Sequence, residues 1–248
     1  MDLDQDSGVR NADKIIEYAK DQSRLLSEQL AHDNFAIFLG GDCSIIIGIA
    51  IALKAKGNYG LFFLDGHTDY VSPEISESKA AAGMDLAIIT GYGHQKLTNI
   101  LDLGPYMEQK HVWCVGNREY DPRVVNEILE SEIKYIDLKT LRQIGLKDCA
   151  SQFLEMVKEH QLDGFIVHLD VDVLNDEIMP AVDSRESDGL YYDELIILLS
   201  ELLSNDKAIG IEITILDPTL DTDGIYTKAF VTNLIKVFKN GIAENQPE

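Results

Sequence analysis

Apolar runs of strand length alternate with segments of helical period along nearly the whole chain. The strand candidates are residues 35–39, 59–64, 112–115, 134–136, 165–169 and 209–215. Periodic apolar positions predict helices at residues 12–30, 44–54, 122–130, 146–160, 192–204 and 228–238. This alternation is typical of a parallel sheet covered by helices on both faces. No linker interrupts it, so we predict a single-domain, three-layer α/β/α fold with a mainly parallel sheet over residues 1–248.

The net charge limits the possible partners of the protein, and the cysteine content indicates its cellular location. The 248 residues carry a net charge of −22 at pH 7, which argues against nucleic acid and against anionic membranes as partners. The longest apolar stretch, residues 43–53, is too short to span a bilayer. Three unclustered cysteines favour a reduced, cytoplasmic protein.

The unusual polar residues stand where the predicted strands end. Residues 35–39 run into GGDCS, residues 59–64 into DGHTD, residues 165–169 into DVD, and residues 209–215 are followed by DPTLD. Ligands of parallel sheets bind beyond the carboxyl ends of the strands. We therefore expect one site that gathers Asp42, Cys43, Asp65, His67, Asp69, Asp170 and Asp172.

The spacing of these residues indicates a metal site. Asp65, His67 and Asp69 alternate, so their side chains share one face of an extended segment. Asp170 and Asp172 repeat that spacing. Converging carboxylates need a cation at low dielectric, and oxygen ligands with one imidazole suit Mn²⁺. Two such ions would lower the pKa of a shared water. The alternative is that these residues are solvated loop residues or helix caps.

The four motifs GGDCS, DGHTD, LDVDVL and DPTLD, in this order and spacing, resemble those of the ureohydrolase family. That family contains arginase, agmatinase, guanidinobutyrase and formimidoylglutamase. The resemblance implies an arginase-like α/β fold and a binuclear Mn²⁺ site. It also implies hydrolysis of the C–N bond of a small guanidine or amidine by a metal-bridging hydroxide. We expect a homo-oligomer.

The resemblance assigns roles to the residues of the motifs. It implies that Asp65 and Asp170 bridge the two ions and are central to catalysis. Cys43 and Asp69 would complete the ligands of one ion, and His67 with Asp172 those of the other. Asp42 would cap the following helix or orient a ligand. The resemblance extends to residues 116–122 and makes Asp121 a candidate contact of the substrate's amino group. The alternative is that Asp121 is a plain loop residue.

The sequence departs from the family pattern at three positions. Cys43 replaces a histidine ligand; its thiolate favours ions softer than Mn²⁺, and the alternative is a small buried residue beside a weak or empty site. Ala82 stands where many members have a proton-shuttling histidine. Ile215 occupies the usual position of the acid that holds the guanidinium, and Glu212 would bind substrate only if the strand register differs.

Two further residues and the start of the chain complete the prediction. His168 shares a strand face with Asp170 and could orient a ligand, replace one, or be a neutral core histidine. Arg185 could bind a substrate carboxylate or pair with its neighbours Asp183, Glu186 and Asp188. The resemblance also implies that a strand preceding residue 12 is missing.

The best interpretation is a metal-dependent hydrolase of a linear amidine or guanidine. A related amide hydrolase of the deacetylase type, with one metal, is the first alternative, because Asp65, His67 and one of Asp170 and Asp172 would suffice for it. A protein that keeps the scaffold and binds a ligand without catalysis is the second.

Overall fold

The computed structural model describes residues 2–29 and 35–244, and its centre is a sheet of six parallel strands. The strands are β1 (Ala36–Leu39), β2 (Tyr59–Leu64), β3 (Val112–Asn117), β4 (Lys134–Asp137), β5 (Gly164–Asp170) and β6 (Ala208–Thr214). They lie in the order β1-β6-β5-β2-β3-β4, and every neighbouring pair is parallel. Each strand lies where the apolar runs predicted it.

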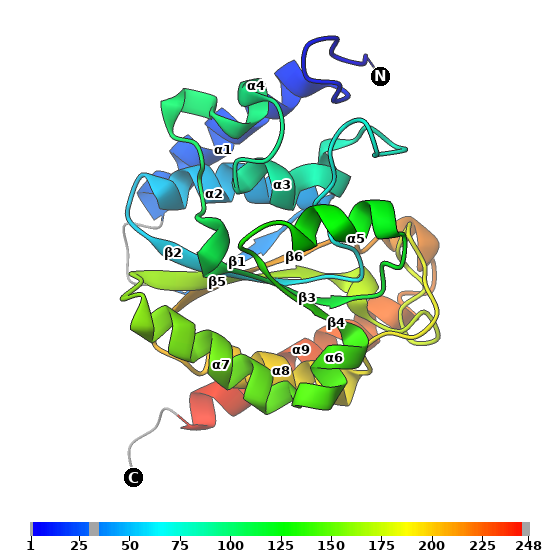
Figure 1. Ribbon diagram of the computed structural model, residues 1–248. Helices are drawn as coiled ribbons and strands as arrows, with labels where there is room; N and C mark the ends of the chain where they lie inside the picture. Colours follow the sequence, from blue (N-terminus) through cyan, green and yellow to red (C-terminus); the bar gives the residue numbers. More distant parts are fainter. Residues whose placement is uncertain (1, 30–34, 245–248) are drawn as a thin grey trace.

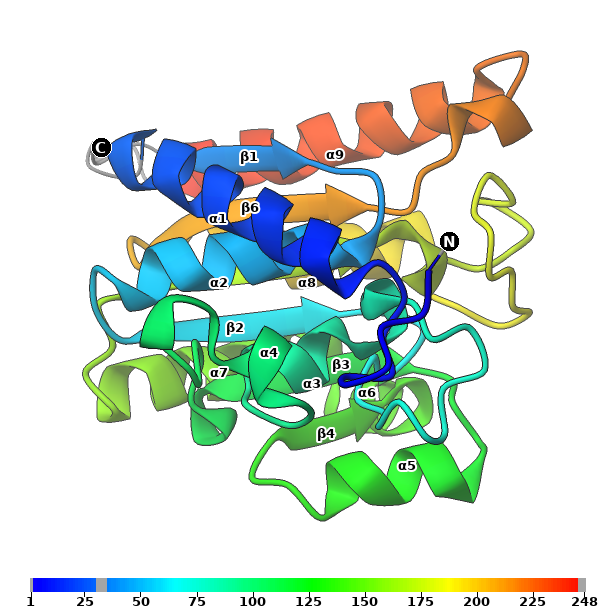
Figure 2. The same ribbon diagram turned by 90° about the horizontal axis from the view of Figure 1, so that it is seen from above.

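Helices cover both faces of this sheet, which gives the three layers that the sequence predicts (Figures 1 and 2). One face carries α1 (Ala12–Gln29), α2 (Ile46–Lys54), α3 (Asp85–Ile89), α4 (Gln95–Thr98) and α5 (Pro122–Leu129). The other carries α6 (Leu138–Ile144), α7 (Leu146–Glu159), α8 (Tyr192–Leu203) and α9 (Ile225–Glu244).

The predicted helices differ from the structure mainly at the C-terminus and in short segments. The last helix begins three residues earlier and extends beyond the predicted 228–238. Helices α3, α4 and α6 were not predicted, because four to seven residues are too few to show helical periodicity. The predicted end of the first helix at residue 30 lies outside the described residues.

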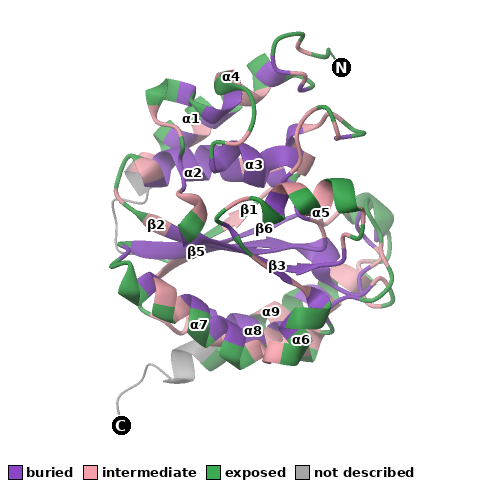
Figure 3. Cartoon of the chain, viewed as in Figure 1, coloured by how far each residue is buried: buried purple, intermediate pink, exposed green. Residues whose placement is uncertain are grey.

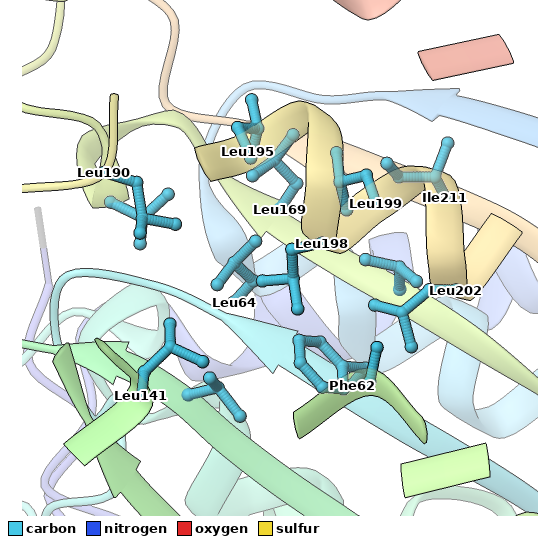
Figure 4. Close-up of a cluster of buried hydrophobic side chains, with 14 of the residues drawn as sticks. Phe62, Leu64, Leu141, Leu169, Leu190, Leu195, Leu198, Leu199, Leu202 and Ile211 are labelled. Carbon is cyan, nitrogen blue, oxygen red and sulfur yellow. The ribbon is translucent and has the colours of Figure 1, made fainter. Parts of the chain in front are cut away.

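The core consists of two apolar clusters, one on each face of the sheet. Alternate residues of β2 supply both: Phe62 and Leu64 face α6–α9, whereas Leu61 and Phe63 face α1–α5. Figure 4 shows part of the first cluster, where Phe62 and Leu64 meet side chains of α8. Each such fully buried side chain stabilises the fold by roughly 1.5–3 kcal/mol. Figure 3 shows that burial is continuous through the central strands and α2.

The strand order places a switch point between β2 and β5. From β2 the chain proceeds outward to β3 and β4 and then returns to β5 on the other side of β2. Connections that leave in opposite directions open a crevice at the carboxyl ends of these two strands. Within the described residues, no helix has the length and apolar character needed to cross a lipid bilayer.

Candidate metal centre

The carboxyl ends of β2 and β5 bring the predicted metal ligands to one point. Asp65 directly follows β2 and Asp170 ends β5, and the pairing of Leu64 with Leu169 sets the two aspartates side by side. Side-chain donor atoms that lie within 4.8 Å of one another form three overlapping groups: Cys43, Asp65, His168 and Asp170; Cys43, Asp69 and Asp85; and Asp65, His67 and Asp172. All six predicted ligands thus belong to one cluster.

We call the group of Asp65, His67 and Asp172 the histidine end. The Nδ1 atom of His67 lies 3.0 Å from Asp172 Oδ2, and the His67 amide donates to Asp65 Oδ1 at 2.7 Å. Burial lowers the pKa of His67, but the hydrogen bond and charge of Asp172, with the charge of Asp65, outweigh it and raise this pKa to about 9. Without a metal ion the imidazole is therefore protonated at neutral pH, and metal binding must displace that proton.

We call the group of Cys43, Asp69 and Asp85 the thiol end. Cys43 opens a short 3-10 helix (Cys43–Ile45), and Asp42 caps it by accepting the Ser44 amide at 3.0 Å, which is one of the two roles expected of Asp42. The Cys43 thiol donates to Asp170 Oδ2 at 2.9 Å. Burial raises the pKa of Cys43 well above its usual value, and the charge of Asp170 raises it further. Without a cation Cys43 is a neutral thiol.

Asp85 is a member of this end that the sequence reasoning missed. It is the first residue of α3 and is 0% exposed. Neither carboxylate oxygen has a hydrogen-bond partner among the described residues. Burial raises the pKa of Asp85, and the charges of Asp69 and Glu212 add to the effect. The signal that could have found it is a single charged residue within the otherwise apolar segment 80–89.

His168 and Glu212 form a buried pair beneath the cluster. The Nδ1 atom of His168 lies 2.7 Å from Glu212 Oε2, and the ring stacks on Phe63 with centroids 4.1 Å apart. The other ring nitrogen, Nε2, has no hydrogen-bond partner among the described residues and lies 3.9 Å from Asp65 Oδ2. A carboxylate on one ring nitrogen, with the other facing a donor cluster, is typical of histidines that bind metal.

The predicted substrate contact by Glu212 is not supported by this geometry. Glu212 is fully buried, and the register of β5 with β6 pairs it with His168 inside the sheet rather than beyond its end. Burial raises the pKa of Glu212, partly offset by the charge of His168. The side chain does not line the cavity above the strands.

A cavity of about 540 Å³ lies over the carboxyl ends of the strands. Ala82 and Ile215, which replace titratable residues of the family pattern, both line it. Asp121 lines it as well, caps α5 by accepting the Arg123 amide at 2.9 Å, and forms an ion pair with the Arg123 guanidinium at 2.5 Å. The cluster residues on its wall are Cys43, His67, Asp69, Asp170 and Asp172.

Arg185 is not among the residues that line this cavity. Its guanidinium is half-exposed and pairs with Asp176. The structure shows this ion pair with Asp176 in place of the expected pairing with Asp183, Glu186 or Asp188. Neither that pairing nor a contact with a substrate in the cavity is supported.

Arg118 is a second residue that the sequence reasoning missed. It is 2% exposed and donates to the carbonyl oxygens of Asp172, at 2.7 Å, and Val173, at 3.1 Å. Its own amide donates to the carbonyl oxygen of Gly66 at 2.8 Å. Arg118 therefore ties together the segments after β2, β3 and β5, and it places a fixed positive charge beside the histidine end.

The donor set fits divalent metal ions. The pKa values of Asp65, Asp69, Asp85 and Asp170 are all raised, first by burial and then by the charges of neighbouring aspartates. Asp65 Oδ2 and His168 Nε2 are buried without hydrogen-bond partners among the described residues. Such groups are costly to bury unless a cation or hydrogen bonds compensate them. Carboxylates and imidazole suit Mn²⁺, and the thiol of Cys43 suits a softer ion.

The chain is similar to known proteins over most of its length. The family model described as "Arginase family" matches residues 4–238. The arginase of Staphylococcus aureus (strain MRSA252) is 29% identical over 219 residues, 88% of this chain and 72% of that protein. The arginase of Bacillus caldovelox is 29% identical over 217 residues, 87% of this chain and 72% of that protein. The chain therefore belongs to the arginase family and is an arginase-family hydrolase.

Solved structures agree with this assignment. The structure of Bacillus caldovelox arginase matches with a TM-score of 0.86 and 26% identity, over 96% of this chain and 80% of that one. A formimidoylglutamase from Bacillus subtilis shares the fold, with a TM-score of 0.75 and 24% identity over 96% of this chain and 68% of that one. The resemblance drawn from the four motifs is thus confirmed, and so is the predicted fold class.

Proposed function

We propose that this protein hydrolyses a C–N bond of a linear amidine or guanidine with the help of two divalent metal ions. The observation that supports this most strongly is the convergence of six predicted ligands beneath one cavity, in a chain of the arginase family. Two bound ions, Mn²⁺ by family resemblance, would lower the pKa of a water between them and so supply the nucleophile.

We assign different residues of the chain to each of the two ions. Asp65 belongs both to the histidine end and to the group that contains Cys43 and Asp170, so we assign it to both ions. Asp170 accepts a hydrogen bond from the Cys43 thiol at one oxygen and from the Asp172 amide at the other, so it contacts a residue of each end, and we assign it the same role. His67 and Asp172 would hold one ion, and Cys43 with Asp69 the other. His168, fixed by Glu212, would orient these ligands from below.

The cavity favours a small cationic substrate. Four aspartates line it besides Asp170, namely Asp69, Asp121, Asp172 and Asp183, and the whole chain carries a charge of −22. Such a field attracts guanidinium and amidinium groups. We propose Asp121 as a contact of the substrate's amino group, because it lies on the cavity wall. Three buried, unpaired cysteines fit a cytoplasmic location, which we propose together with a homo-oligomeric assembly.

The test is turnover by protein loaded with a known metal. Preparations with Mn²⁺, Co²⁺ or Zn²⁺ are each incubated with arginine, agmatine, guanidinobutyrate and formimidoylglutamate, and released urea and ammonia are measured. We expect release from at least one substrate. Asp170→Asn should abolish it, whereas Asp148→Asn, which removes an exposed aspartate of α7, should not.

Two results would replace this proposal. Two bound ions without turnover of any of these substrates would favour a protein that keeps the scaffold for binding alone. A single bound Zn²⁺ together with deacetylation of an acylated amine would favour the deacetylase-type alternative.

A further inference from the structure

The carboxylate of Asp85 has no role in the function proposed above, yet it lies inside the cluster. It is completely buried, and neither oxygen has a hydrogen-bond partner among the described residues. A buried carboxylate in this situation requires a cation. The question is which cation Asp85 faces.

The fold holds Asp85 against the thiol end. A carboxylate oxygen of Asp85 lies within 4.8 Å of donor atoms of both Cys43 and Asp69. The amide of Ala87, two residues further along α3, donates to the carbonyl oxygen of Asp69 at 3.2 Å. Leu86 is fully buried in the core of this layer. Helix α3 is therefore anchored on both sides, and the carboxylate cannot turn outward to water.

We propose that Asp85 is a metal ligand that, with Cys43 and Asp69, holds the ion at the thiol end. This inference rests on the proposed function, since it adds a ligand to the metal centre named there. A thiolate and two carboxylates form an anionic set that includes one soft donor. The thiol end therefore binds Zn²⁺ or Co²⁺ in preference to Mn²⁺, whereas the oxygen and nitrogen donors of the histidine end accept Mn²⁺.

The experiment is a titration of metal-free protein with Co²⁺, followed by calorimetry and by the sulfur-to-cobalt charge-transfer band in the near ultraviolet. The wild type is compared with Asp85→Asn, which keeps the size of the side chain and removes its charge. Thr90→Val is the matched control: Thr90 is buried at the end of the same helix and donates to the carbonyl oxygen of Leu86, outside the cluster.

We expect two bound Co²⁺ ions and a charge-transfer band in the wild type and in Thr90→Val. In Asp85→Asn the ion beside Cys43 should bind at least about tenfold more weakly, since loss of even an outer partner of a ligand costs that much. The band should weaken with it. Unchanged affinity and band in Asp85→Asn would overturn the proposal, and so would an equal loss in Thr90→Val, which would implicate the helix rather than the carboxylate.

Thermal unfolding separates a lost ligand from a damaged fold. At neutral pH, metal-free Asp85→Asn should melt at a higher temperature than the metal-free wild type, because folding no longer has to keep a buried carboxyl protonated. Its gain in melting temperature on adding Co²⁺ should be smaller. A lower melting temperature in both states would contradict the assignment. A wild type that binds no Co²⁺ would overturn the metal centre itself, whereas two ions bound with equal affinity in both proteins would overturn only the role of Asp85.

Discussion

The two ends of the metal centre differ in how their buried negative charge is compensated. At the histidine end, the protonated His67 lies 3.0 Å from Asp172, and Arg118 donates to the backbone of the same aspartate. Positive charge is thus present before any metal binds. At the thiol end, the side chains of Cys43, Asp69 and Asp85 include no cationic group, and the pKa of each is raised.

This difference predicts unequal dependence on metal. The histidine end is held by its own ion pair, and a metal ion there competes with a proton on His67. The negative charge of the thiol end can be removed only by protonation of its groups or compensated only by a bound cation. Leaving the centre without metal therefore costs more at the thiol end, because its three side chains include no cation to offset the buried acids.

Removing the carboxylate that links the two ends should have the largest effect. Asp65→Asn should abolish binding of both ions, because Asp65 belongs to the histidine end and also to the group that contains Cys43 and Asp170. Elemental analysis of the dialysed protein should find no metal, against two ions in the parent. The exposed Asp148→Asn serves as the control. Metal bound as tightly as in the parent would show that the ends do not share this ligand.

Removing the thiol should affect one end only. Cys43→Ala should lose one ion of two, and Cys43→His should shift the preference of that position toward Mn²⁺. His67→Ala should lose the other ion and leave the sulfur-to-cobalt band in place. Metal content measured beside the parent decides the matter. A stoichiometry unchanged in Cys43→Ala would make Cys43 a small buried residue rather than a ligand.

The pair beneath the centre should matter less than the ligands. Glu212→Gln keeps a hydrogen-bonding group for His168 but removes the charge that orients its ring. We expect metal affinity to fall by about tenfold, as for other outer partners of ligating histidines. Calorimetric titration with Co²⁺ measures it, with Thr90→Val as control. If affinity is unchanged, His168 is a core histidine rather than part of the centre.

The smallest effect is a pH dependence of the metal-free protein. The raised pKa values of Asp65, Asp69, Asp85 and Asp170 mean that the folded state holds protons that the unfolded state has released. The stability that they contribute is complete below their unfolded values near ~3.9 and is lost as the pH rises through the folded values. His67, with a pKa of about 9, acts in the same direction between about pH 6.5 and 9.

Metal-free protein should therefore melt a few degrees lower at about pH 8 than at about pH 6. Metal affinity should show the opposite trend, because binding releases these protons. Thermal scans in matched buffers with and without Co²⁺ measure both. A melting temperature that rises with pH in the metal-free protein would contradict the assigned proton positions.

The strands and the ligands that follow them could be predicted from the sequence, because long apolar runs and short motifs determine them. Each of the six strands follows such a run, and the groups after β2 and β5 converge because neighbouring parallel strands end at one edge of the sheet. These features depend on local pattern and on a general rule of topology. The predicted ligands of the histidine end, Asp65, His67 and Asp172, meet for this reason.

The missed residues depend on paths that no local pattern encodes. Asp85 reaches the thiol end because the segment after Asp69 folds back and α3 binds its carbonyl oxygen. Arg118 binds backbone carbonyl oxygens of the segment after β5. Every residue has such an oxygen, so no residue type in the sequence indicates this contact. The position of Glu212 could not be predicted for a similar reason. Its pairing with His168 follows from the register of β5 with β6, which is known only once the strands are paired.

The most direct test of a centre with two unlike ends is a crystal grown from metal-free protein and soaked with excess Mn²⁺ and only one equivalent of Zn²⁺ per chain, because Zn²⁺ at equal concentration would displace Mn²⁺ from both ends. Anomalous difference maps at the absorption edges of both metals identify the ion at each position. We predict two ions, with Zn²⁺ contacting Cys43 Sγ and Mn²⁺ contacting His67 and Asp172. A single ion, or no ion within bonding distance of Cys43, would contradict a binuclear centre with a thiol end.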